Sequence, residues 1–192
     1  MEPLTVPEGA PSAAATEAAV ARWLDEVVIG LNLCPFAAGP RRKDQIRIAV
    51  CHPSDENDLT ETLVEELDHL AATDPKVLET TLLAVEGLLS DFDDYRRFVD
   101  FAEVLVLQYG WEGVFQVASF HPDYQFADTE PDDPGNLTNR SPCPILHLIR
   151  EESLARVLAR YPDPDAIPAT NIRRVSELTP EERARLFPYL LR

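Results

Sequence analysis

The sequence predicts an α/β or α+β domain, in which a mixed or parallel sheet of about four strands has helices packed on it. Its length and composition suit this class, because 192 residues with 45% hydrophobic side chains supply a sizeable core. Short apolar segments of strand character also alternate along the chain with longer segments that have the period of a helix. A long segment rich in proline and aspartate interrupts this alternation before the last strand.

Four short segments are predicted to be strands, because each is apolar, too short for an ordinary helix and bounded by charged or turn-forming residues. The first, QIRIAVC, alternates between polar and apolar side chains. The third contains VFQVASF at residues 114–120, an apolar run typical of a buried strand. The predicted strands cover residues 45–51, 80–87, 114–121 and 145–149.

Three amphipathic helices are predicted from apolar residues at spacings of three and four. The first ends at residues 32–35, because Cys34 precedes a proline. The second begins near Ser54 or Asp55, and the third opens at residues 90–93, SDFD, which resemble a capping box. Their apolar stripes are Val20, Trp23, Leu24, Val27, Val28 and Leu31; Leu59, Leu63, Leu67 and Leu70; and Phe92, Tyr95, Phe98, Val99, Ala102, Leu105 and Val106.

The two ends of the chain are predicted to differ from the domain between them. Residues 1–13 contain three prolines and a glycine and are typical of a flexible leader. A single domain is expected over residues 14–160, closed by a short helix over residues 151–160. Residues 161–192 are predicted to form a proline-rich linker and a C-terminal helical arm, whose helix starts at Thr179 with proline next and glutamate completing a capping box.

The composition excludes several classes of function. An excess of 34 acidic over 17 basic residues gives a net charge of −17, whereas nucleic-acid binding requires a concentrated positive surface. No apolar run approaches the ~18 residues of a spanning helix, and the N-terminus lacks a signal-peptide pattern. Three cysteines without a C-x-x-C motif argue against a disulfide framework or a structural zinc module. We therefore expect an acidic, cytoplasmic protein that binds neither nucleic acid nor membranes.

The strongest candidate for a functional site is the end of the third predicted strand, within SFHPDYQFAD at residues 119–128. His121 opens the longest irregular segment of the chain, and ligands of open α/β sheets bind beyond the carboxyl ends of strands. In extended backbone His121 and Asp123 leave the same face, which suits a carboxylate that orients a general base, or a pair of metal ligands. The alternative is that His121 only anchors the loop.

The loop that follows His121 offers further polar groups for catalysis and substrate binding. Arg140 is a lone arginine among acidic residues, so it either pairs with them or presents its guanidinium to a ligand carboxylate or phosphate. Tyr124, Asn136 and Asn139 are the other candidates for substrate binding in this loop.

A second candidate segment is NLCPFA at residues 32–37, which is followed by Arg41, Arg42 and Lys43. Its Cys-Pro-Phe resembles the active-site turn of thioredoxin-fold transferases, but that fold needs a long helix directly after the cysteine, so we exclude a redox function. Cys34 is a candidate reactive thiol, with a small buried hydrophobe as the alternative. Arg41 and Arg42 would attract a small anion if they fold over the loop after His121, and otherwise form a solvated turn.

The sequence gives weaker evidence for a functional role of the remaining histidines. His147 lies between two isoleucines at alternate positions of the last strand, which is more typical of a core residue than of a ligand. Its best functional role is to support His121 from a neighbouring strand. His52 and His69 are predicted to be surface residues.

Several longer motifs resemble one protein family. GLNLCPFA, VFQVASFHPDYQFA, NRSPCPILHLIRE and the pattern YPDP…IP…NI are similar to the bacterial domain-of-unknown-function family 1415, from about Trp23 to Asn171. Members of that family often have tyrosine where this chain has Cys143, which argues against Cys143 as a ligand or nucleophile. The resemblance implies a compact, cytoplasmic bacterial protein in which these segments form one unit, and it implies no activity.

Two functions stay open at this point. In the first, the protein is an enzyme that acts on a small anionic metabolite, with His121 as general base or metal ligand, Asp123 as its partner and Arg140 as an anion clamp. Cys34 and Tyr124 would line the pocket, and a divalent metal is the candidate cofactor. In the second, the protein is a non-catalytic binding or assembly module, which uses the proline-rich loop and the C-terminal arm. The sequence predicts no oligomeric state.

Overall fold

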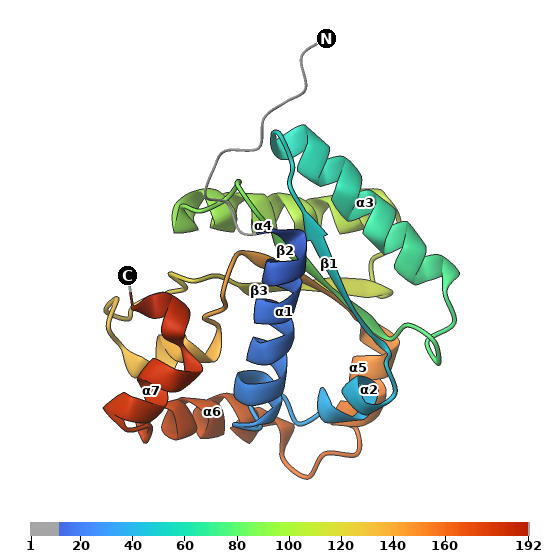
Figure 1. The fold of residues 1–192 in the computed structure, drawn as a ribbon. Coiled ribbons are helices and arrows are strands. Elements are labelled where there is room, and N and C mark those ends of the chain that lie inside the picture. The colour runs from blue at the N-terminus through green and yellow to red at the C-terminus, as the bar shows by residue number, and fades with distance from the viewer. Residues whose placement is uncertain (1–11, 192) are drawn as a thin grey trace.

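A four-stranded mixed sheet forms the centre of the computed structural model, which describes residues 12–191 (Figure 1). Its spatial order is β1-β2-β4-β3, with β1 and β2 parallel and β4 antiparallel to both of its neighbours. This confirms the predicted α/β class and its mixed sheet. The predicted leader lies almost entirely outside the described residues. The strands are β1 (Ile46–Cys51), β2 (Thr80–Val85), β3 (Phe115–Phe120) and β4 (Ile145–Arg150).

Two long helices, α3 (Glu56–Ala72) and α4 (Phe92–Gln108), cover one face of the sheet. Both bury the apolar stripes predicted from the sequence. Asp55 begins α3 as expected, because its side chain accepts hydrogen bonds from the backbone N–H groups of Asn57 and Asp58. The core of this layer joins the helices to β2 and β4 through Leu63, Leu67, Leu83, Val85, Tyr95, Phe98, Leu146 and Leu148.

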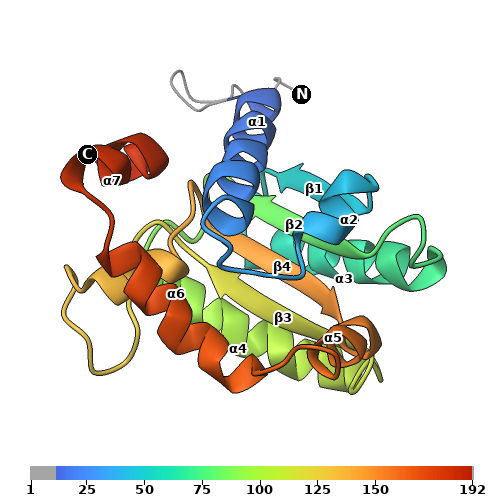
Figure 2. The same ribbon diagram turned by 90° about the horizontal axis from the view of Figure 1, so that it is seen from below.

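The opposite face is covered by α1 (Ala13–Trp23), which continues as a π-helix over Leu24–Ile29. A short helix, α2 (Ala38–Arg42), follows before β1, and Figure 2 shows α1 and α2 on the same side of the strands. Val20, Val27 and Ile145 belong to the core of this layer. The apolar stripe predicted for the first helix is therefore confirmed as its buried face.

The C-terminal segment joins the same core. It comprises α5 (Glu151–Leu158), a 3-10 turn (Pro164–Ala166), α6 (Ile167–Ser176), α7 (Pro180–Leu186) and a final 3-10 turn (Pro188–Leu190). Thr179 and Glu182 form the predicted capping box of α7. Leu186 and Phe187 are 6% and 1% exposed and pack with residues of α1, so the apolar end of the arm docks on its own domain.

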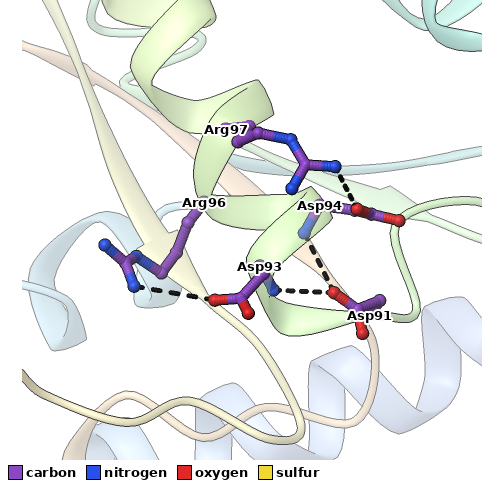
Figure 3. Close-up of polar contacts among 5 residues, drawn as sticks. All are labelled: Asp91, Asp93, Asp94, Arg96 and Arg97. Carbon is purple, nitrogen blue, oxygen red and sulfur yellow. Dashed lines mark hydrogen bonds and ion pairs between the residues drawn. The ribbon is translucent and has the colours of Figure 1, made fainter.

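Two local predictions need correction. The third predicted helix, α4, is capped by Asp91 rather than Ser90, because the Asp91 side chain accepts hydrogen bonds from the N–H groups of Asp93 and Asp94 (Figure 3). Figure 3 also shows the ion pairs Asp93–Arg96 and Asp94–Arg97, which close this first turn. The predicted linker after residue 160 is partly helical, because α6 already begins within it.

The long connection from β3 to β4 returns the chain antiparallel to β3, with a 3-10 turn at Pro134–Thr138. The hydroxyl of Tyr95 on α4 bonds to both β3 and β4 where this connection begins. It donates to the carbonyl oxygen of Ile145 at 2.7 Å and accepts from the N–H of Phe120 at 2.9 Å. The two strands are thereby joined through a side chain at this end, and the connection leaves the sheet beside α4.

Among the helices described, none combines the length and the apolar character that crossing a membrane would require.

Candidate functional site

An apolar cleft of about 280 Å³ lies on the sheet face that carries α1. Its floor is formed by side chains of β2, β3 and β4, and its walls by the end of α1, the segment 34–40 and α5. Ligand sites for small molecules are typically built in this way, with an apolar lining and few polar groups. The apolar lining of the cleft includes Trp23, Phe36, Leu82, Ala118, Phe120 and Leu154.

His147 on β4 lines this cleft, and Thr80 on β2 fixes its ring. Thr80 Oγ1 lies 2.6 Å from the carbonyl oxygen of Leu148, to which it donates its single proton. The same oxygen lies 2.8 Å from His147 Nε2, so it accepts a hydrogen bond from that nitrogen. His147 is therefore the Nε2–H tautomer, with the lone pair of the ring on Nδ1.

The His147 ring stays neutral at physiological pH. Burial lowers the pKa of His147 to about 4, because the apolar surroundings disfavour the charged imidazolium. Within residues 12–191, no hydrogen bond reaches its Nδ1. The cleft is thus lined by a neutral histidine whose Nδ1 can accept a hydrogen bond, because Thr80 fixes the ring proton on Nε2.

Two other polar groups of the cleft, Cys34 and Arg150, are neutral or held by backbone atoms, and Glu79 and Ser153 also line it. Burial raises the pKa of Cys34, so its side chain stays a neutral thiol. Arg150 donates through Nη2 to three backbone carbonyl oxygens within residues 70–78, which fixes its charge at the end of α3. A ligand in the cleft would therefore meet mainly apolar surface, with the acceptor nitrogen of His147 in the lining.

His121, the strongest sequence candidate, lies on the opposite side of the sheet and is 0% exposed. Its Nδ1 accepts a hydrogen bond from the backbone N–H of Asp123 at 3.0 Å, so its Nε2–H donates to the carbonyl oxygen of Leu89 at 3.0 Å. The ring also packs against Phe92 and Tyr95 of α4. This geometry corresponds to the loop anchor, and it leaves both ring nitrogens engaged with backbone groups.

The substrate-binding candidates of the loop also bond to the loop itself. Asn136 is 0% exposed and accepts from the N–H of Phe126, while its amide donates to a carbonyl oxygen. Asn139 donates to the carbonyl oxygen of Ser119 at the end of β3. Arg140 donates to the carbonyl oxygens of Tyr124 and Pro131. These side chains order the connection instead of converging on a common cavity.

The remaining candidates are distributed over separate places. The Tyr124 ring packs between Phe92 and Phe126, and the Asp123 side chain is exposed. Arg41 forms a two-pronged ion pair with Asp25 at 2.8 Å, and the neighbouring Arg42 is exposed. Cys34 packs with the core on the α1 side of the sheet, away from the His121 ring, so the two do not share a site.

The metal hypothesis for His121 and Asp123 finds no third ligand. Within the described part of the chain, no three histidine, cysteine, aspartate or glutamate side chains come together in a way that could hold a metal ion.

Sequence reasoning missed the partnership between Thr80 and His147. The two residues are 67 positions apart, and they meet only because β2 and β4 are antiparallel neighbours. The alternation of His147 with isoleucines was a usable signal that it lies on the same face as Ile145 and Ile149. That pattern does not show whether the face is packed or opens into a cleft.

Comparisons with known proteins give one match. A family model described as a protein of unknown function (DUF1415) matches residues 15–185. No curated protein and no solved structure matches the chain.

Proposed function

The chain belongs to the DUF1415 family of proteins of unknown function, and from the geometry of the apolar cleft we propose that it binds a small, mostly apolar molecule that carries one hydrogen-bond donor. The observation that carries the proposal is the His147 ring, whose Nε2–H is fixed by Thr80 while Nδ1 has a free lone pair. A ligand hydroxyl or N–H group can donate to that nitrogen. The volume of about 280 Å³ limits the ligand to a compact molecule.

This proposal favours the binding module over the enzyme among the two functions expected from the sequence. Its support is that the cleft is mainly apolar and includes the acceptor nitrogen of His147, while the thiol of Cys34 is kept neutral by burial. The enzyme that would use His121 and Asp123 on an anionic metabolite has less support, because the histidine is buried and bonded to backbone at both nitrogens. A cytoplasmic location, as expected from three unpaired cysteines, is part of the proposal.

The test compares two probes of nearly the same shape, p-cresol and toluene, by isothermal titration calorimetry at neutral pH. Wild-type protein is expected to bind p-cresol at least about tenfold more tightly, because only p-cresol donates a hydrogen bond to His147 Nδ1. In His147→Phe, which keeps a ring and loses the acceptor, this preference should disappear while toluene binding persists.

A second variant tests whether the cleft is the binding place. Ala118 lies on its floor, and Ala118→Leu should fill the cavity and abolish binding of both probes. Equal affinity of p-cresol and toluene for the wild type, or binding unchanged in Ala118→Leu, would overturn the proposal.

A further inference from the structure

A second cavity, of about 450 Å³, lies where the parallel strands β1 and β2 end. Glu86 directly follows β2 and lines this cavity, and His52 directly follows β1. The other walls come from α1, from the segment before β4 and from the C-terminal turn, and they include Thr16, Trp23, Cys143 and Tyr189. The carboxyl ends of strands are where open α/β sheets usually bind their ligands.

Glu86 is the unusual residue of this cavity, because its acidic side chain is largely buried and has few partners that could offset the cost of burying it. The residue is 9% exposed, and within residues 12–191 no hydrogen bond reaches its Oε2. His52 Nδ1 lies 3.2 Å from that oxygen, but the His52 side chain is half exposed and approaches from solvent. Burial raises the pKa of Glu86, and His52 opposes this shift.

Among the charged side chains that line the cavity, Glu86 is the one that has no charged partner in the lining itself, since His52 lies outside it. Arg22 and Glu26 also line it, but they form an ion pair with each other at 3.0 Å. The thiol of Cys143 is neutral, because burial first and the Glu86 carboxylate among the further causes raise its pKa to about 12. A chain with a net charge of −17 also attracts cations and repels anions.

From this arrangement we propose that the cavity at the ends of β1 and β2 binds a small organic cation, whose ammonium group pairs with Glu86. An ammonium group supplies both the positive charge and the hydrogen-bond donors that the buried carboxylate lacks. The apolar walls supplied by Trp23 and by the alanines of α1 would receive the carbon part of the ligand. The inference does not depend on the function proposed for the apolar cleft, which shares Trp23 with this cavity and is lined by different charged residues.

The experiment is an NMR titration of the ¹⁵N-labelled full chain with n-butylammonium chloride at neutral pH and low salt. The neutral n-butanol serves as the matched probe. Butylammonium should shift the amide signals of residues around Glu86 and Cys143, and it should bind at least about tenfold more tightly than butanol. Glu86→Gln, which keeps the shape and removes the charge, should reduce the butylammonium affinity by the same factor.

A matched variant separates a specific site from general attraction to an acidic protein. Glu79→Gln removes the same charge at the rim of the apolar cleft, and it should leave butylammonium binding unchanged. The proposal is overturned if butylammonium causes no shifts up to its solubility limit, if butanol binds equally well, or if Glu79→Gln and Glu86→Gln weaken binding alike. Far-ultraviolet circular dichroism of each variant verifies that it is folded.

Discussion

Replacing His121 by alanine would remove two hydrogen bonds from a turn that is shielded from water. The N–H of Asp123 and the carbonyl oxygen of Leu89 would lose their partner, and an unsatisfied buried group costs about 1–3 kcal/mol. We therefore expect His121→Ala to lower the free energy of unfolding by this amount in urea denaturation. His69→Ala, at an exposed position of α3, is the control and should change it by less than about 0.5 kcal/mol. Unchanged stability in His121→Ala would contradict the anchor and return this residue to the enzyme hypothesis.

His147 makes the stability of the fold depend on pH. Its pKa is lowered from 6.5 to about 4 in the folded chain, so between these values the unfolded chain binds the proton more readily. The contribution of the neutral ring is fully present above pH 6.5 and is lost as the pH falls toward 4. The free energy of unfolding should decrease by about 2–3 kcal/mol more in the wild type than in His147→Phe over this range. Urea denaturation of both proteins at several pH values measures this difference, and parallel pH profiles would contradict it.

The position of His121 was predictable from its sequence, whereas its role was not. An apolar run that ends in a histidine followed by proline identifies the end of a buried strand, and the structure has β3 end at Phe120. The partner of the ring is the carbonyl oxygen of Leu89, 32 residues earlier, and a contact of this kind depends on the packing of α4 against the sheet. The same limit applies to Glu86, whose exposure and surroundings depend on three segments far apart in the chain.

At the scale of single elements, the start of α4 offers a sharp test of capping. Asp91 accepts hydrogen bonds from two backbone N–H groups, while the preceding Ser90 lies outside the helix. Asp91→Ala should reduce the free energy of unfolding by about 1 kcal/mol, since loss of an N-cap exposes unpaired N–H groups at the helix start. Ser90→Ala is the neighbouring control and should have almost no effect. Thermal unfolding distinguishes the two, and an equal loss in both variants would contradict the assignment of the cap.

Elements with a strong local pattern were predictable, and those that depend on tertiary packing were not. The helices α3 and α4 present complete apolar stripes, so their spacing alone defines their buried faces. In contrast, α6 has one fully buried residue, Val175, and begins among prolines that are typical of a linker. Its side chains instead anchor the turn after α1, because Asn171 and Arg174 donate to carbonyl oxygens of residues 31–33. Contacts of this kind produce no periodic pattern in the sequence, so they could not be predicted from it.

At the scale of the whole molecule, the two ends of the described chain stabilise each other. Val20 on α1 and Phe187 after α7 belong to one core, and the hydroxyl of Tyr189 and the indole N–H of Trp23 both donate to the carbonyl oxygen of Arg140. The long connection between β3 and β4 is thus held by both ends of the chain. This explains why the C-terminal segment, which the sequence suggested as a separate arm, takes part in the core.

Phe187 tests whether this docking occurs within one molecule. Its side chain is 1% exposed and packs edge-to-face on Tyr189, so Phe187→Ala should leave a cavity and lower the free energy of unfolding by about 3–5 kcal/mol. Leu191→Ala, at a residue that is 70% exposed, is the control and should change it by less than about 0.5 kcal/mol. Because the contact is intramolecular, the loss should be the same at low and high protein concentration. A loss that grows with concentration would show instead that the C-terminal segment stabilises an assembly of several chains, and the assembly hypothesis would then replace the single-chain core.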